Sequence, residues 1–339
     1  MKAKISKTIY ASVICALVAG AFIGYALSKA VSYKEVSSLP TIKAPVEIRV
    51  NTTNYKFINP LLYIGTDKNL YVDQYKGLVN SLNGYIQSVT PTKATDVSVY
   101  FRDMNDAHWT GIGENDKYRP SSMMKVVTLM ATLKSIENGT VSPYNMLSYT
   151  PTDPGLQYYP ANDGMAIGAY SVQDLFKSMI MYSDNGSDLA LLSDNGIKNE
   201  YISVYNIFRL PLASSSDQDF MSAKSYSVVW RTLYNSTLLS DDDSNQALQL
   251  LSESTFKDGL VAGMPAGVTV SHKFGEFTDD APSGIVINRE LHDCGIIYYP
   301  GHPYLLCVMS RGSDFPSLAQ VIAGASKIVY DYVASSTAP

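Results

Sequence analysis

The sequence is poor in the residues that bind metals and nucleic acids. Only four of its 339 residues are histidine and three are cysteine, and their spacings match no standard zinc pattern. We therefore expect no metal site. Acidic residues outnumber basic ones, 31 to 26, and the formal net charge of −5 argues against a nucleic-acid partner. Because 46% of the residues are hydrophobic and 17% are charged, the chain has enough apolar residues for a folded core.

Charged residues are also absent from Ile9–Leu27, a mostly apolar stretch that follows three lysines. A helix of this length is about enough to cross the hydrocarbon core of a membrane, and the basic flank favours an N-terminus on the inside. We expect residues 1–28 to be a transmembrane anchor that places the rest of the chain outside the cytoplasm. A cleaved signal peptide is the alternative, with a cleavage site at Ala26-Leu27-Ser28, and it would give a secreted protein.

Two of the three cysteines flank a predicted hairpin. Cys294 and Cys307 are equally far from the turn at Pro300-Gly301, so they can face each other across two strands. A disulfide fits an extracytoplasmic compartment, whereas two buried thiols fit the pattern equally well. Both alternatives stay open at this point.

Hydrophobic periodicity divides the rest of the chain into strands, then helices, then strands and one last helix. Alternation of apolar and polar residues predicts strands, and apolar residues three and four apart predict helices. The predicted strands are 97–101, 109–112, 268–272, 295–299 and 304–309. The predicted helices are 69–89, 120–137, 171–182, 222–239 and 316–333.

Strands from both ends of the chain must share one sheet, so the helical middle forms a second lobe. We expect an α/β (α+β) domain over residues 61–339, preceded by a linker and an apolar segment over residues 29–60. Its antiparallel sheet, flanked by helices, takes residues 61–117 and 265–335, and its all-helical lobe takes residues 118–264. A cleft between a sheet edge and a helical lobe is a natural place for an active site.

The first of three short motifs is S-x-x-K, formed by Ser122 and Lys125. Residues three apart on a helix share a face, so the hydroxyl and the amine are neighbours. A hydroxyl becomes a good nucleophile when a base takes its proton, and a lysine with a lowered pKa can be that base. Alone, the motif is a weak signal because it occurs often by chance.

The second motif, Ser183-Asp184-Asn185, follows a predicted helix. A second serine hydroxyl can pass a proton to a leaving nitrogen, and Asn185 can both donate to and accept from an amide substrate. Ser-Asp-Asn-Gly is also ordinary chemistry for a turn that ends a helix. We interpret the copy at Ser193-Asp194-Asn195-Gly196 in that structural way.

The third motif, Lys273-Phe274-Gly275, lies at the end of a predicted strand. A fixed ammonium on Lys273 can hold a substrate carboxylate, and Gly275 lets the strand backbone approach a ligand closely. The backbone N–H groups of Glu276 and Ser122 are expected to form an oxyanion hole.

Together, and in this order, the three motifs resemble the S-x-x-K, S-D-N and K-T-G signature of class A β-lactamases and penicillin-binding proteins. The flanking segments are similar too, and the resemblance runs from about residue 65 to residue 335. It implies a class A β-lactamase-like fold and a serine hydrolase that needs no cofactor. The implied catalytic residues are Ser122 as nucleophile, Lys125 as its base and Ser183 as proton carrier, and the implied substrate-binding residues are Asn185, Lys273, Gly275 and Glu276.

Two departures from the family bear on activity. Class A enzymes clear their acyl-enzyme with a glutamate on the Ω loop, but this chain has no glutamate between Glu200 and Glu253. The loop should fall between Asp194 and Met221, where Asp217 and Asp219 are the carboxylates that could replace the glutamate. Phe274 replaces the family's Thr or Ser, and we expect it to narrow the site or to make it more apolar.

The sequence therefore predicts a β-lactamase-like serine hydrolase that forms an acyl-enzyme on Ser122 with β-lactams or peptidoglycan-type peptides. Loss of a general base typically costs about 10²–10⁴-fold in rate, so we expect weak deacylation. The alternatives are a D-Ala-D-Ala carboxypeptidase- or transpeptidase-like enzyme and a non-catalytic module that binds cell-wall fragments or β-lactams. The presence of both Ser122 and Lys125 favours chemistry over binding alone.

Overall fold

The computed structural model separates residues 1–44 from a second unit, residues 45–339. The predicted anchor, residues 1–28, lies outside the residues that the structure describes. No helix within the described part is long and apolar enough to span a bilayer. The described residues are 47–49, 55–64, 73–153, 157–159, 164–211, 218–280 and 286–337.

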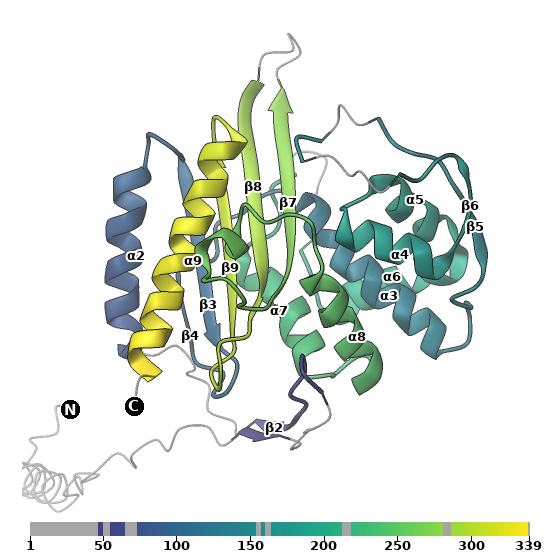
Figure 1. Ribbon diagram of the computed structural model, residues 1–339, viewed down its shortest axis with the longest axis horizontal. Helices are drawn as coiled ribbons and strands as arrows, with labels where there is room; N and C mark the ends of the chain where they lie inside the picture. The colour runs from purple at the N-terminus through teal and green to yellow at the C-terminus, as the bar shows by residue number, and fades with distance from the viewer. Residues whose placement is uncertain are drawn as a thin grey trace, which may run out of the picture. The chain divides into compact units, whose positions relative to one another are not determined.

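The centre of the second unit is a five-stranded antiparallel sheet in the order β4-β3-β9-β8-β7 (Figure 1). Its strands come from both ends of the chain, which confirms that the two ends share one sheet. Within the described part, β7 is an edge strand, and it is the strand nearest the group of helices on one side of the sheet. The strands are β3 (Asp96–Asp103), β4 (Trp109–Ile112), β7 (Val270–Asp280), β8 (Val286–Ile297) and β9 (Tyr304–Gly312).

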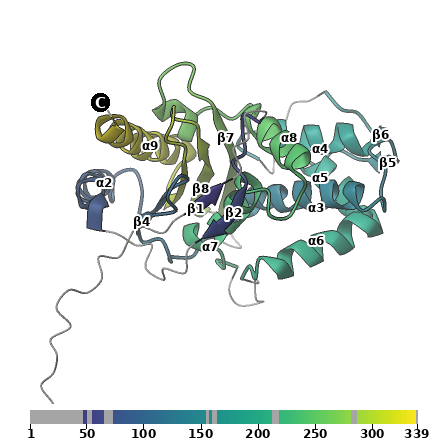
Figure 2. The same ribbon diagram turned by 90° about the horizontal axis from the view of Figure 1, so that it is seen from below.

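Helices cover both faces of this sheet (Figures 1 and 2). Side chains alternate along a strand, so Val99 of β3 packs with α2 (Lys76–Val89) and α9 (Phe315–Thr337), whereas Tyr100 belongs to the core on the other face. That other face is covered by α7 (Ala223–Tyr234), which contacts β3, β8 and β9. α7 falls in the range predicted for the helical lobe but packs on the sheet.

The helical lobe is built around α3 (Lys125–Glu137), which is buried on nearly every side, as expected for an apolar helix surrounded by others. It contacts α4 (Val172–Met181), α5 (Asn185–Ser193), α6 (Asn195–Ile207) and α8 (Asp241–Ser252). The shorter elements are β1 (Glu47–Arg49), β2 (Leu61–Ile64), β5 (Met146–Tyr149), β6 (Gly168–Ser171), η1 (Asp73–Tyr75), η2 (Ser121–Met124) and η4 (Leu260–Gly263).

Both Ser-Asp-Asn-Gly segments begin a helix. α4 ends at Met181, but α5 begins at Asn185, where the sequence predicted a turn. The carboxylate of Asp184 accepts a backbone N–H of the new helix at 2.6 Å, and Asp194 caps α6 in the same way. The predicted end of the helix before this segment is therefore confirmed, but the new helix was not predicted; it starts here because aspartate is a strong N-cap and satisfies N–H groups that a helix start leaves unpaired. The interpretation of the second segment as structural agrees with its capping role.

Two elements differ in length from the prediction. β7 continues to Asp280 and pairs with β8 throughout, so Lys273-Phe274-Gly275 lies inside the strand instead of at its end. Polar residues dominate from Glu276 onward, so hydrophobic periodicity did not indicate this extension. The predicted helix 222–239 ends at Tyr234, and the separate helix α8 follows.

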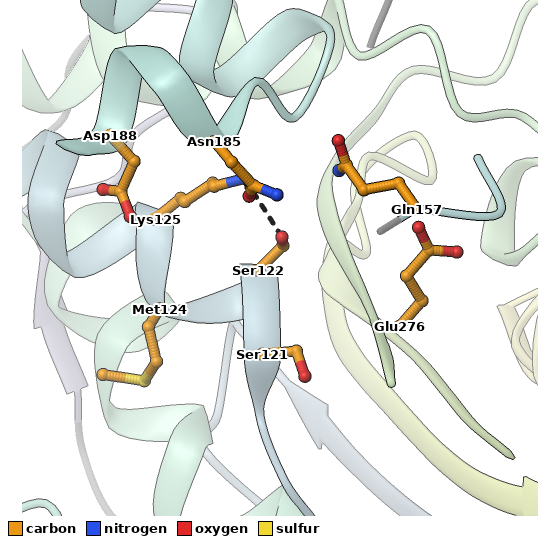
Figure 3. Close-up of a pocket in the computed structure, with 8 residues that line it drawn as sticks. All are labelled: Ser121, Ser122, Met124, Lys125, Gln157, Asn185, Asp188 and Glu276. Carbon is orange, nitrogen blue, oxygen red and sulfur yellow. Dashed lines mark hydrogen bonds between the residues drawn. The ribbon is translucent and has the colours of Figure 1, made fainter. Parts of the chain in front are cut away.

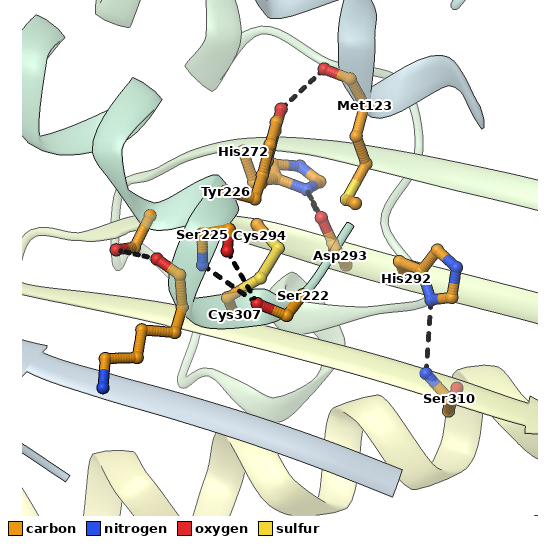
Figure 4. Close-up of a disulfide and its surroundings, with 12 residues drawn as sticks. Met123, Ser222, Ser225, Tyr226, His272, His292, Asp293, Cys294, Cys307 and Ser310 are labelled. Atoms are coloured by element: carbon orange, nitrogen blue, oxygen red, sulfur yellow. Dashed lines mark hydrogen bonds and ion pairs between the residues drawn. A yellow bond between two sulfur atoms is a disulfide. The ribbon is translucent and has the colours of Figure 1, made fainter. Parts of the chain in front are cut away.

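Cys294 and Cys307 are direct partners across β8 and β9 and form a disulfide, which decides between the two alternatives (Figure 4). On β7, beside this pair, the ring Nδ1 of His272 lies 2.9 Å from Oδ1 of Asp293, and both side chains are fully buried. His272 directly precedes Lys273 in the sequence, so its buried contact with Asp293 of β8 holds the edge strand β7 in place at the third motif.

Candidate active site

The backbone turns sharply just before the first motif serine and at the second. Ser121 has φ of 48° and Ser183 has φ of 60°, in the left-handed region that non-glycine residues rarely adopt. Such outliers persist where the surrounding structure holds them, and they concentrate at functional sites. The two turns direct Ser122, at the start of η2–α3, and Ser183, between α4 and α5, toward the same lysine.

That lysine is Lys125, which is 3% exposed. Its Nζ donates to Ser122 Oγ at 3.1 Å, to the Ser183 carbonyl oxygen at 2.5 Å and to Asn185 Oδ1 at 2.6 Å. These three bonds use all three donors of a protonated ammonium. The structure thus brings the two serines, Asn185 and Lys125 into direct contact (Figure 3).

Burial lowers the pKa of Lys125 to about 8, against the opposing effect of nearby carboxylates, of which Asp188 is the strongest. Desolvation disfavours the charged amine, so part of the population is neutral near physiological pH. A neutral Lys125 within hydrogen-bond reach of Ser122 Oγ can accept its proton. Its environment is therefore suited to a general base.

Ser183 Oγ lies between two lysines. Lys273 Nζ donates to it at 2.8 Å, and Lys125 Nζ lies 3.4 Å away. Burial, together with the charge of Lys125, holds the pKa of Lys273 well below its usual range. A hydroxyl in this position can lose its proton to a substrate atom and be resupplied by a neighbouring amine.

Lys273 is fully buried and uses its ammonium on Ser183 Oγ and on the carbonyl oxygen of Phe274, at 3.1 Å. The structure therefore places it behind Ser183 and not in the wall of the cavity described below. Its predicted role as a holder of a substrate carboxylate stays a prediction.

Gly275 permits a close approach of two backbone segments, and the segment that comes close to it is the protein's own chain at Pro120–Met123. A Cβ atom at this position would lie 2.4 Å from the carbonyl oxygen of Pro120 and 3.2 Å from the backbone nitrogen of Met123. Glycine thus lets β7 pack directly on η2, which carries Ser122, the predicted nucleophile. The predicted approach to a ligand stays a prediction.

A cavity of about 220 Å³ opens at Ser122 (Figure 3). Four of the predicted site residues line it, namely Ser122, Lys125, Asn185 and Glu276. Two polar side chains that the sequence did not indicate, Gln157 and Asp188, line it as well. Among the described residues, no group of three or more histidine, cysteine, aspartate or glutamate side chains is arranged to hold a metal ion.

Glu276 lies across the cavity from Lys125 (Figure 3). Its Oε1 accepts the backbone N–H of Tyr158 at 3.0 Å, and Oε2 accepts that of Tyr159 at 3.2 Å. Burial raises the pKa of Glu276, while these N–H bonds oppose the shift. Gln157 Nε2 donates to the Ser183 carbonyl oxygen at 3.3 Å, so the segment 157–159 bridges the two sides of the cavity.

Phe274 is not among the residues that line this cavity. It is 4% exposed and stacks on Phe256 with ring centroids 4.2 Å apart, and Tyr159 packs against both rings. Because the ring lies in the core, Phe274 does not line the cavity, and the expectation that it narrows the site or makes it more apolar was wrong.

Asp219, one of the two candidate replacements for the missing glutamate, is occupied elsewhere. Its carboxylate pairs with Arg311 Nη2 at 2.5 Å, next to Glu290, and it lines a different cavity with those two residues. Asp217 lies outside the described residues. The structure thus does not bring Asp219 to Ser122.

Comparison with known proteins identifies the family of the chain. Residues 81–333, more than half of the chain, match the model of the beta-lactamase enzyme family, and the chain belongs to that family. Its fold and motifs place it in the serine β-lactamase and penicillin-binding protein superfamily. A comparison with curated proteins gave no match.

Solved structures show the same fold at low sequence identity. PBP-A is 19% identical, with a TM-score of 0.62 over 76% of this chain and 97% of PBP-A. A beta lactamase from Xanthomonas campestris is 18% identical, with a TM-score of 0.65 over 76% of this chain and 98% of the other. The TLA-1 extended spectrum beta-lactamase is 19% identical, with a TM-score of 0.62 over 75% of this chain and 98% of the other.

Proposed function

We propose that this protein is a serine acyl-transfer enzyme that forms an acyl-enzyme on Ser122 with β-lactams or peptidoglycan-type amides. The observation that carries the proposal is the contact of Lys125 Nζ with Ser122 Oγ at 3.1 Å, in a buried setting that lowers the pKa of the amine to about 8. A base within hydrogen-bond reach of a hydroxyl is the arrangement that nucleophilic catalysis requires.

The chemistry follows from these contacts. Neutral Lys125 takes the proton of Ser122 as Oγ attacks the carbonyl carbon of the amide. Ser183 Oγ then gives its proton to the leaving nitrogen, and the amine of Lys125 or Lys273 restores that proton. Backbone N–H groups of Ser122 and Glu276 are expected to stabilise the oxyanion.

The substrate class rests on likeness to relatives. A mutant of PBP-A has been solved as an acyl-enzyme complex with penicillin G, and several similar structures are extended-spectrum β-lactamases. These proteins share the fold of this chain. We therefore place β-lactams and the peptide amides of the cell wall first among its substrates.

Deacylation is proposed to be slower than in enzymes that have the Ω-loop glutamate, because this chain lacks that residue and Asp219 is paired with Arg311. An amine acceptor in place of water would make the protein transpeptidase-like, and water would make it a carboxypeptidase or a slow β-lactamase. A binding module is the second candidate, favoured by the carboxylate of Glu276 in the cavity and the burial of Lys273.

Intact-protein mass spectrometry tests the proposal. The purified protein would be incubated with penicillin G and with a chromogenic cephalosporin, with Ser122→Ala as control. We expect a covalent adduct on the wild type and none on the variant. If neither compound adds to the wild type and the cephalosporin stays intact, the binding module becomes the better hypothesis.

We also propose that the catalytic domain works outside the cytoplasm, attached to the membrane by residues 9–27 or released after cleavage. The Cys294–Cys307 disulfide supports this, because disulfides persist in oxidising compartments. When intact cells or spheroplasts are treated with an external protease, the domain should be degraded. A cytoplasmic protein in the same cells should survive. Protection of the domain until lysis would contradict the proposal.

A further inference from the structure

α5 carries a second polar residue on the face that bears Asn185. Asp188 lies three positions later, so the two side chains project from the same side of the helix. Both line the cavity at Ser122, and they flank Lys125 from the same helix (Figure 3). The side chain of Asp188 is therefore part of the cavity wall beside the catalytic lysine.

The carboxylate of Asp188 is incompletely satisfied. Thr128 of α3 gives it one side-chain hydrogen bond, but Oδ1 is buried and has no hydrogen-bond partner among the described residues. A buried carboxylate oxygen without a partner is unfavourable, and such atoms in native proteins usually bind water or take part in chemistry. The adjoining cavity of about 220 Å³ exceeds the roughly 10–15 Å³ that one water needs.

Charge links this carboxylate to Lys125. Burial raises the pKa of Asp188, and the charge of Lys125 is the strongest influence that opposes the rise. Asp188 is in turn the strongest of the charges that oppose the lowered pKa of Lys125. The charge of each group therefore influences the protonation of the other.

The other carboxylate in the cavity, Glu276, is less suited to accept a proton. Both of its oxygens already accept backbone N–H groups, from Tyr158 and Tyr159. Hydrogen bonds to the ionised form make a carboxylate a weaker base. Glu276 also lies across the cavity from Lys125 (Figure 3).

We propose that Asp188 is the base of the deacylation step: it accepts a proton from the water that attacks the acyl ester on Ser122. The inference rests on the proposed acyl-enzyme and assigns its hydrolysis to α5 in place of the missing loop glutamate.

The step balances as follows. Water oxygen bonds to the ester carbonyl carbon, and one water proton passes to Asp188. Collapse of the tetrahedral intermediate breaks the bond between that carbon and Ser122 Oγ, which takes a proton from the Lys125 ammonium. Asp188 then returns its proton to Lys125, and the acid product leaves with the second proton of the water.

The test is the lifetime of the penicillin adduct in Asp188→Asn, followed by mass spectrometry of the full chain after removal of free penicillin. We expect the decay of the adduct to slow by about 10²–10⁴-fold, the usual contribution of a general base. Adduct formation should be unchanged or faster, because loss of the negative charge lowers the pKa of Lys125 further. A merely structural role for Asp188 would instead slow both steps.

Three variants complete the design. Asp188→Glu keeps the carboxylate and should retain part of the hydrolysis even if the amide variant folds poorly. Asp331→Asn makes the same change on an exposed α9 residue paired with Lys327 and should decay like the wild type. Glu276→Gln tests whether the other carboxylate in the cavity is the base instead of Asp188.

The outcomes are distinct. In the wild type, the rate of decay should fall with acid as Asp188 becomes protonated, and this limb of the pH profile should vanish in Asp188→Asn. Equal lifetimes in wild type and Asp188→Asn, or a loss confined to Glu276→Gln, would overturn the inference while leaving the acyl-enzyme intact. A wild-type adduct that never decays would overturn it as well. Absence of any adduct on the wild type would overturn both proposals together.

Discussion

At the scale of single residues, the site is a small set of amines and hydroxyls whose protonation is set by burial. Lys125 and Lys273 share contacts to Ser183 Oγ, and desolvation lowers the pKa of both. Two ammonium groups this close repel each other, so loss of one proton relieves both. Burial is thus the main cause of the lowered pKa of Lys125, and the charge of Lys125 adds to the lowering of the pKa of Lys273.

This predicts how acylation depends on pH. With a pKa of about 8 for Lys125, about a tenth of the amine is neutral at pH 7 and about nine tenths at pH 9. The rate of adduct formation should therefore rise about tenfold between these values and then level off. Stopped-flow measurements with a chromogenic cephalosporin would show it.

A matched variant sharpens that measurement. Lys125→Arg keeps the positive charge but cannot deprotonate, so its adduct formation should fall below detection at every pH. A flat profile in the wild type, or acylation by the arginine variant, would show that another group is the base.

At the scale of elements, the site depends on how closely β7 packs on η2. Gly275→Ala would place a methyl group 2.4 Å from the Pro120 carbonyl oxygen, so strand and helix must separate. We expect a loss of about 1–3 kcal/mol in the free energy of unfolding, the usual cost of overpacking, together with slower acylation. Gly84→Ala in α2, where nothing lies within 4 Å, should instead stabilise by about 0.5–1 kcal/mol. The denaturant concentration at the midpoint of unfolding should fall for Gly275→Ala and rise for Gly84→Ala. A shift of both midpoints in the same direction would contradict the packing argument.

The arrangement of the elements also explains which site residues the sequence could and could not predict. Ser122 and Lys125 were found because their spacing on one helix already implies their contact. Asp188 was missed because its place in the site depends on α5, which begins where a turn was expected. Phe274 was misjudged because only tertiary packing decides which face of β7 turns toward the core.

At the scale of the whole molecule, the architecture joins parts of the chain that no local pattern connects. The sharing of one sheet by both ends followed from the order of predicted elements, since strands without partners are unstable. The bridge of Gln157 to Ser183 and the separate pairing of Asp219 with Arg311 depend on tertiary contacts 26 and 92 residues apart. Sequence spacing carries no information about such distances.

The strand order has a consequence for how the protein matures. Among the described strands, β9 is the last to be synthesised, yet within the sheet it lies between β3 and β8 and joins the early strands β3 and β4 to the pair β8 and β7. Contacts that close long loops form late in folding. A nascent chain that still lacks residues 304–312 already contains Ser122, Lys125, Ser183 and Lys273 but has no complete sheet to hold them together. We therefore expect a chain that lacks residues 304–312 to form no adduct with penicillin.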